Sequence, residues 1–373
     1  MSIRPSETIQ RILISTTSRF YGAFERPRIL LSHAWSSPAA PQGTARLEEG
    51  PSCRNAFVLS FETEPIERLP GTVIPDRSIG GEILCAYLAV LFGKRFDNHG
   101  AFEQNGMFQL PAFGQFSEFC DPRRPQNGHS PRVDFPVPLN LTELERIERL
   151  LVGPTIDERV LRTFQGAAKF YLQALQTVEH DPEVAYLHLI TCGEILSNFE
   201  DYPKEELLDE ETAALFRQIR DGLPDGDAIA KKVANRLFQV KRRFLKTILR
   251  FVDSAFFTRT EAPELYTALQ EVDFARRLGA AYDLRSRYVH TGSPFGGWMG
   301  AVRSETQHGR PVLRDEELAD RIYLAPTYPG LERIMRYCLL RFLEANGIYR
   351  YPTANAQQGV APDERAPAAP ARG

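Results

Sequence analysis

Several signals that would narrow the fold or the compartment are missing from this sequence. Its five cysteines are odd in number, widely spaced and form no CxxC pair, so neither a disulfide framework nor a cysteine zinc site is indicated. The N-terminal residues carry no apolar segment of a secretory signal. The longest apolar stretch lies within residues 83–92 and is too short to span a bilayer. We therefore expect a cytoplasmic protein that has no membrane partner.

An excess of either charge is also missing. The formal net charge of -3 excludes a strongly basic, histone-like protein, although it leaves room for a local basic patch. Lysine is scarce, because only 7 of the 45 basic residues are lysine and the rest are arginine.

Common cofactor and hydrolase motifs are absent as well. The sequence contains no P-loop, no GxGxxG, no HExxH and no GxSxG. Residues 292–300 are rich in glycine, but neither a strand nor a helix frames them as a phosphate loop, and we expect a mobile loop there whose Trp298 could stack on a base. We therefore expect no bound cofactor and no metal.

The length of 373 residues suggests about two domains. Residues 1–140 have a mixed α/β pattern, with strands expected at 28–32 and 55–62 and a helix at 78–94. The proline, glycine and asparagine content of residues 97–137 predicts long loops, in which His99 and His129 would face solvent. Nothing in this N-terminal part names a ligand, and its role as a sensor, a substrate adaptor or structural packing stays open. A regulatory partner protein is a possible partner of the whole chain.

Helical periodicity dominates residues 141–350, and the fold class expected overall is α+β, with a C-terminal all-α bundle behind a mixed N-terminal domain. Residues 351–373 are rich in alanine, proline, glycine and glutamine and are predicted to be a disordered tail. The helices expected in the bundle cover residues 141–151, 155–180, 182–198, 228–256, 273–290 and 331–344.

One helix carries an arginine inside an apolar stripe. Positions 274, 278, 281, 285 and 288 define one face of the helix at 273–290, and Arg285 is its one charged member. Burying an arginine without a partner is costly, so Arg285 should reach solvent or a carboxylate. Glu194 lies on an inward face of another helix, together with Leu187 and Ile190, and is a candidate partner. Two unrelated, half-exposed side chains remain the alternative.

His290 follows Arg285 by five residues and precedes Gly292, which is placed for a left-handed helix cap. Five residues correspond to a rotation of roughly 140° on an ideal helix, so the two side chains point in different directions unless the last turn deforms or two copies of the chain share a site. An arginine five residues before a histidine occurs four times in this chain, so spacing alone does not single out this pair.

Residues 282–292, Tyr-Asp-Leu-Arg-Ser-Arg-Tyr-Val-His-Thr-Gly, resemble the terminal motif of HEPN domains, closest to the Apea-like branch. The segment around Glu194 is similar to the acidic helix of that family, and the helix at 331–344 to its closing helix. The resemblance covers about residues 145–345. The sequence departs from the pattern in having Thr291 before Gly292 and a long stretch at 293–325 before the last helix.

The resemblance implies an all-α homodimer in which the two Arg/His motifs meet, and it implies a metal-independent endoribonuclease of a bacterial defence, toxin or stress system. By analogy His290 is the general acid/base, Arg285 stabilises charge on the phosphate, Ser286 positions phosphate or water, and Glu194 orients Arg285. Some members of the family bind RNA, nucleotides or a partner protein without chemistry, and this second reading stays open.

Basic residues at helical spacing suggest a phosphate-binding strip beside this motif. A solvated face of a core helix, balanced by the acidic residues of 205–211, explains the same pattern. The candidate RNA-binding residues are Arg287, Lys232, Arg236, Arg243, Lys246 and Arg250.

Overall fold

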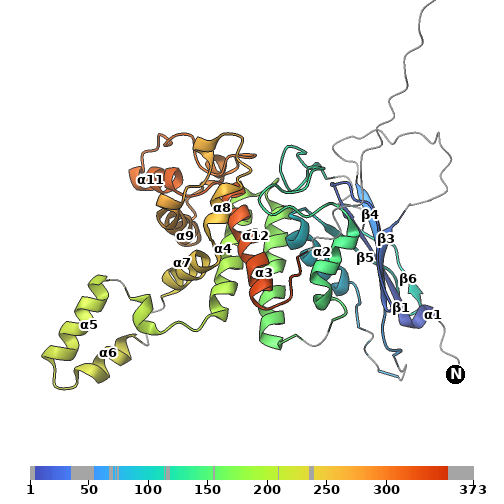
Figure 1. The fold of residues 1–373 in the computed structure, drawn as a ribbon, viewed down its shortest axis with the longest axis horizontal. Coiled ribbons are helices and arrows are strands. Elements are labelled where there is room, and N and C mark those ends of the chain that lie inside the picture. The colour runs from blue at the N-terminus through green and yellow to red at the C-terminus, as the bar shows by residue number, and fades with distance from the viewer. Residues whose placement is uncertain are drawn as a thin grey trace, which may run out of the picture.

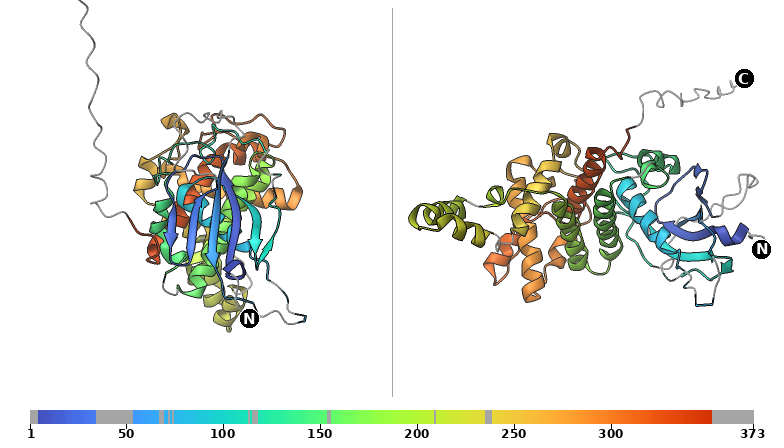
Figure 2. Two further views of the ribbon diagram at one scale, coloured as in Figure 1. Left: turned by 90° about the vertical axis from the view of Figure 1, so that its right-hand side faces the viewer. Right: turned by 90° about the horizontal axis from the view of Figure 1, so that it is seen from below.

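The computed structural model has an antiparallel sheet in its N-terminal part and helices in its C-terminal part, so the expected α+β composition is confirmed (Figure 1). One layer of helix covers the sheet, and the other helices extend away from it (Figure 2). The structure describes residues 5–34, 54–66, 70–71, 73, 75–112, 114, 118–153, 156–208, 210–234 and 239–351. The tail predicted at 351–373 lies outside these residues except for Tyr351.

Six strands in the described part of the chain form one sheet in the order β2-β3-β4-β1-β5-β6. The central strand, β1, is buried along most of its length and pairs antiparallel with both β4 and β5. Strands β3 and β4 confirm the two predicted strands within one residue. The strands are β1 (Ile9–Thr16), β2 (Phe24–Arg26), β3 (Ile29–His33), β4 (Asn55–Glu62), β5 (Asp97–Gln104) and β6 (Met107–Phe108), with a short helix α1 (Pro5–Thr8) ahead of β1.

The helix predicted at 78–94 is α2 (Ile79–Phe92), and it lies against the sheet. Its residues from Leu84 to Phe92 are all buried, because the sheet covers one side of the helix and the C-terminal helices cover the other. Gly93 ends α2 in the left-handed conformation, with φ of 63°.

The prediction of continuous loops over residues 97–137 is wrong at its start, where β5 and β6 complete the sheet. His99 is buried in β5 rather than exposed to solvent: its Nε2 lies 2.7 Å from Ser15 Oγ and its Nδ1 lies 2.8 Å from the Ala112 carbonyl oxygen. The polar composition of β5 predicts a loop, but its polar side chains have hydrogen-bond partners in the folded protein, so the segment forms a buried strand. His129 is exposed, as predicted.

The predicted helices of the C-terminal part are present with two exceptions, and the helices at 210–222, 296–299 and 316–324 are ones that the sequence does not predict. The segment at 141–150 is a 3-10 helix, η2, and the helix predicted at 228–256 is divided into α6, α7 and α8. The helices are η2 (Leu141–Leu150), α3 (Glu158–Thr177), α4 (Pro182–Phe199), η3 (Lys204–Leu207), α5 (Glu210–Gly222), α6 (Gly226–Ala234), α7 (Val240–Phe251), α8 (Ser254–Thr258), η4 (Leu265–Thr267), η5 (Glu271–Asp273), α9 (Phe274–Thr291), α10 (Gly296–Met299), α11 (Glu316–Leu324) and α12 (Tyr328–Ala345).

Helices α3 and α4 pack side by side, α12 packs against both of them, and α7 packs against α4. Capping residues set the starts of α3 and α4. Asp157 Oδ1 accepts a hydrogen bond from the amide of Val160 at 3.0 Å, and Asp181 Oδ1 accepts one from the amide of Val184 at 3.0 Å. Pro182 occupies the first turn of α4, as the sequence predicts.

Helices α5 and α6 form a hairpin that projects from the body of the molecule (Figures 1 and 2). Among the described elements, the extensive contacts of α5 and α6 are with each other. The chain leaves the helical body after α4 and returns to it at α7, and these two helices pack directly together.

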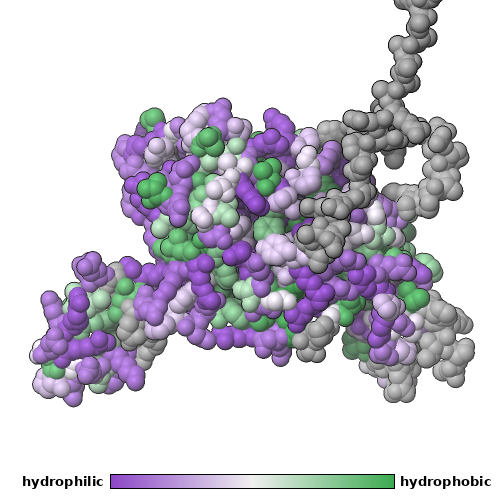
Figure 3. All heavy atoms as spheres, viewed as in Figure 1, coloured by the Kyte–Doolittle hydropathy of each residue, from purple (hydrophilic) through white to green (hydrophobic). Residues whose placement is uncertain are grey.

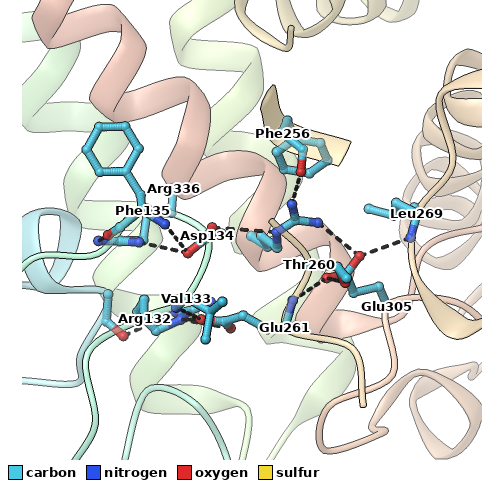
Figure 4. A network of polar contacts seen from close by, with 12 residues as sticks. Arg132, Val133, Asp134, Phe135, Phe256, Thr260, Glu261, Leu269, Glu305 and Arg336 are labelled. Atoms are coloured by element: carbon cyan, nitrogen blue, oxygen red, sulfur yellow. Dashed lines mark hydrogen bonds and ion pairs between the residues drawn. The ribbon is translucent and has the colours of Figure 1, made fainter. Parts of the chain in front are cut away.

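One hydrophobic cluster runs from the sheet through α2 into the helices, across the boundary predicted at residue 140. A buried polar network crosses the same region (Figure 4). Arg132 makes a two-pronged ion pair with Glu332 of α12, at 2.9 and 2.6 Å, and a further one with Glu261 at 2.7 Å. Arg336 of α12 pairs with Asp134 at 3.1 Å and donates to the Leu91 carbonyl at the end of α2 at 2.8 Å. The N-terminal part and α12 are therefore joined by both apolar and ionic contacts, and the division into two domains stays a prediction.

Among the described residues, no helix combines the length and the apolar character needed to cross a bilayer. The face shown in Figure 3 is mostly hydrophilic, with apolar residues in scattered patches.

Candidate functional site

Arg285 and Glu194, which the sequence places on inward faces of two helices, meet in the structure. The Arg285 Nη2 atom on α9 lies 3.2 Å from Glu194 Oε2 on α4. The Tyr282 hydroxyl, one turn before Arg285, donates a hydrogen bond of 2.8 Å to Glu194 Oε1. Each oxygen of the carboxylate therefore has its own partner on α9, and the alternative of two unrelated side chains is wrong.

The site is half-sheltered rather than deeply buried. The side chains of Arg285 and Glu194 are 26% and 15% exposed. Of the other members of the predicted stripe, Phe274, Leu278 and Ala281 are buried and Tyr288 is half-buried. The arginine thus stands at the solvent end of an apolar face, where a partner carboxylate offsets part of the cost of removing its charge from water.

Tyr282 is the member of this site that sequence reasoning does not identify. Its ring packs against Phe244 of α7, with the centroids 5.4 Å apart, and the Arg285 guanidinium carbon lies 5.8 Å from its ring centroid. Burial of the hydroxyl, with the hydrogen bond to Glu194, raises the pKa of Tyr282 to about 12. Tyr282 is therefore a neutral donor at ordinary pH, and it holds the carboxylate in position for Arg285.

A glycine lets the helices around Glu194 come close together. A Cβ atom at Gly193 would lie 2.4 Å from Phe244 Cε2 and 3.1 Å from Met335 Sδ. The absence of a side chain at this position therefore allows α7 and α12 to approach α4 beside the carboxylate.

Arg285 keeps hydrogen-bonding capacity for a ligand. A guanidinium has five N–H donors. Glu194 takes one of them, and within the described part of the chain no other acceptor bonds to Arg285. Ser286, the next residue, is half-buried, and its hydroxyl has no hydrogen-bond partner among the described residues. Both side chains can therefore contribute polar groups to a bound anion.

His290 lies exposed in the last turn of α9. The helix ends as predicted, with Gly292 left-handed at φ of 68° and its amide donating to the Tyr288 carbonyl at 2.8 Å. No described residue hydrogen-bonds the His290 ring. With α9 helical through Thr291, Arg285 and His290 point roughly 140° apart, so one chain does not direct both at one atom.

The expectation of a mobile loop at 292–300 is wrong in part. Residues 296–299 form α10, and Glu183 at the start of α4 anchors the segment: its Oε1 accepts hydrogen bonds from the amides of Gly296 at 2.8 Å and Phe295 at 3.2 Å. Trp298 is 39% exposed on this short helix. The helix α10 is not predictable from the glycine-rich composition of residues 292–300, because the carboxylate that anchors it comes from Glu183, far away in the sequence.

Three of the six predicted RNA-binding residues have acidic partners. Lys246 pairs with Glu206, and Arg250 pairs with Glu200. Arg287 pairs with Asp315. Arg243 is half-buried, Lys232 is exposed on α6, and Arg236 lies outside the described residues. The strip also does not lie on one helix, because α6 ends at Ala234 and α7 begins at Val240. Of the acidic segment at 205–211, Glu206 balances Lys246, and the phosphate-binding role of the other strip residues stays a prediction.

In the described part of the chain, no group of three or more His, Cys, Asp or Glu side chains is arranged to hold a metal ion. No protein-family model, no curated protein and no solved structure matches this chain.

Proposed function

We propose that this protein is a HEPN-type endoribonuclease that cleaves RNA by attack of a ribose 2′-hydroxyl on the adjacent phosphate, in a defence or stress response of the cell. The observation that carries the proposal is the pairing of Arg285 with Glu194 and Tyr282, five residues before an exposed His290 at the same end of α9. An arginine held in place but only partly used, beside a titratable group at a helix end, suits the stabilisation of a phosphate whose charge increases during reaction.

The reaction needs two proton transfers. The 2′-oxygen forms a bond to phosphorus while the bond to the 5′-oxygen breaks, leaving a 2′,3′-cyclic phosphate and a free 5′-hydroxyl. One proton leaves the 2′-hydroxyl, and one is delivered to the departing 5′-oxygen. His290 would act as general acid/base, since histidine changes charge near neutral pH. Arg285 would bind the non-bridging oxygens, and Ser286 would position the phosphate.

Glu194 is a positioning residue in this proposal, because it acts through Arg285.

The directions of the Arg285 and His290 side chains favour a homodimer. Since Arg285 and His290 project to different sides of α9, two copies with their α9 ends together could offer the arginine of one chain and the histidine of the other to the same phosphate. A pair of histidines would also supply one acid and one base.

The proposal is tested by incubating RNA with the wild-type protein, His290→Ala and Arg285→Ala in the presence of a chelator. We expect cleavage products ending in 2′,3′-cyclic phosphate from the wild type and none from either variant. His129→Ala, which removes another exposed histidine, is the matched control and should cleave normally. Cleavage that survives both variants would refute the assignment.

A non-catalytic module that holds RNA, nucleotide or a partner protein is the second candidate. The observation that favours it is the divergence of Arg285 and His290 within one chain, which leaves the site incomplete without a second copy. It predicts RNA binding without cleavage by the dimer, with Arg285→Ala lowering affinity and His290→Ala leaving it unchanged.

A further inference from the structure

A basic trough lies on the side of α9 away from Glu194. Its cavity volume is about 500 Å³, and it has α9 as its floor and α7 and α11 as its walls. The floor is low because two of its residues are Gly279 and Ala280. A Cβ atom at Gly279 would meet nothing closer than Lys241 Cε at 3.9 Å. The lining residues that carry charge are Lys241, Arg242, Arg276, Asp283, Asp320 and Arg321.

Positive charge dominates this trough. Four of the six charged lining residues are cations, and the two anions already have cationic partners. Asp283 accepts from Lys241 at 2.6 Å, and Asp320 pairs with Arg310 at 2.5 Å. Arg276 is exposed, and no described residue forms an ion pair or hydrogen bond with its side chain. Its guanidinium is therefore available to an anion from solution.

The trough shares its face of α9 with His290. At 100° per residue, Arg276, Asp283 and His290 fall within roughly 40° of one another, whereas Arg285 lies on the opposite side of the helix. Steps of seven residues return to nearly the same direction, so this face runs along the helix axis from Arg276 to His290. A linear polyanion lying in the trough would therefore reach the histidine without turning around the helix.

We propose that the α7–α9–α11 trough binds the phosphate backbone of an RNA strand and leads it to His290. This inference rests on the proposed function for the identity of the polyanion, but its residues differ from those of the strip predicted on α7. The unpaired Arg276 supplies a charge for one phosphate, and Arg321, whose partner Glu317 is solvent-exposed, supplies a charge for the next. Gly279 and Ala280 in the floor and Leu245 and Leu324 in the walls form an apolar surface against which the sugars would lie.

Binding is measured in the full-length His290→Ala protein, so that the probe stays intact. The probe is a labelled single-stranded RNA of mixed sequence, and its affinity is determined by anisotropy over a series of salt concentrations. We expect Arg276→Glu to weaken binding by about tenfold at low salt and to make the salt dependence shallower, by roughly one phosphate contact. Arg276 has no partner to lose, so the thermal unfolding temperature should not fall.

The matched control is Arg217→Glu on the α5–α6 hairpin, which changes the same charge on an exposed arginine that has no described partner. It should bind RNA as the parent does. A second trough variant, Arg321→Gln on α11, should weaken binding in the same direction, because its present partner Glu317 is solvent-exposed and needs little replacement.

The outcomes separate this inference from the proposed function. Equal loss of affinity in Arg276→Glu and Arg217→Glu, or no loss in either, overturns the trough even if the wild type cleaves RNA. Loss confined to the trough variants supports the trough even if no RNA is cleaved, in which case the nuclease proposal fails alone. If the parent does not bind RNA under any salt condition, both are overturned.

Discussion

Arg285 on α9 and Glu194 on α4 form an ion pair of 3.2 Å that joins two helices almost a hundred positions apart in the sequence. Tyr282 completes the arrangement from one turn below, because its hydroxyl bonds to the other carboxylate oxygen. The pair is partly sheltered from water, so it combines a structural role with access to a ligand.

The coupling between these two side chains is measurable. A double-mutant cycle with Arg285→Ala and Glu194→Gln should give an interaction free energy of about 1–2 kcal/mol in urea unfolding, more than an exposed pair provides. An additive cycle would mean that the ion pair contributes nothing. For positioning, the informative readout is kinetic: Glu194→Gln should lower kcat for RNA while changing KM little, which a purely structural role does not predict.

His290 should be a residue whose removal affects activity and not stability. Its side chain is exposed, and no described residue bonds to it, so His290→Ala should change the unfolding free energy by less than about 0.5 kcal/mol. RNA cleavage should nevertheless disappear. A stable His290→Ala protein that still cleaves would contradict the general acid/base role, and a large stability loss would contradict the exposed placement.

Two glycines, one on each helix of the site, should respond in opposite ways to the same substitution. Gly193→Ala forces a Cβ atom against Phe244 and should destabilise by about 1–3 kcal/mol. Gly279→Ala adds its methyl group in open space within α9 and should stabilise by about 1 kcal/mol through helix propensity. Chemical denaturation of both proteins checks the prediction, and equal effects would show that α4 and α7 are not as close as described.

Arg132 should be among the residues that the fold tolerates least. Its side chain is 1% exposed and lies between Glu332 and Glu261, so Arg132→Met leaves two buried carboxylates without their cation. We expect a loss of about 3–5 kcal/mol. Arg162→Met is the control, because its pair with Glu158 is on the surface and should contribute less than about 1 kcal/mol. Similar losses in the two variants would count against the buried network.

Lys94 should make stability depend on pH. Burial, and then the neighbouring Arg132, lower its pKa from 10.5 to about 7. Between these two values the unfolded chain binds more protons at this site than the folded chain, so the Lys94 contribution is fully present above pH 10.5 and is lost progressively as pH falls from 10.5 to about 7. Unfolding free energies should therefore rise from pH 7 to pH 9.

The control for this pH effect is Lys94→Met. The variant is less stable overall, since the Pro125 carbonyl oxygen loses its donor at 2.6 Å and the Gly128 carbonyl oxygen, at 2.9 Å from Lys94 Nζ, keeps only the Ser18 hydroxyl. Its stability should, however, rise less between pH 7 and pH 9 than that of the wild type. The same rise in both proteins would assign the pH dependence to other groups.

Helices with a clear apolar face could be predicted from the sequence, and α4, α9 and α12 end close to the predicted residues. The strand β1 could not, because it is buried on both faces and shows no alternation, and its partners β4 and β5 lie far along the chain. The strand β5 is concealed by polar residues such as His99, which find their partners only after the sheet has formed.

The candidate site also has parts that the sequence predicts and parts that it does not. An arginine in an apolar stripe predicts a carboxylate, and a glutamate on another inward face supplies it. Tyr282 is not predictable in this way, since a tyrosine at that position is equally well explained as a core residue. The trough depends on the relative placement of α7, α9 and α11, which no local pattern encodes. Lysine and arginine spacing instead favoured a strip on α7, where Lys246 and Arg250 pair with Glu206 and Glu200.

The hairpin of α5 and α6 has a consequence for how the molecule unfolds. Because α4 and α7 pack on each other without its help, the hairpin can open while the rest of the protein remains closed. Backbone amides of residues 210–234 should therefore exchange with solvent deuterium through local opening, at rates indifferent to substitutions that weaken the core. Amides of α4 and α9 should exchange only when the whole molecule unfolds. The chain therefore has two sets of amides that exchange at different rates. The helices joined by the ion pair of Arg285 and Glu194 belong to the slowly exchanging set.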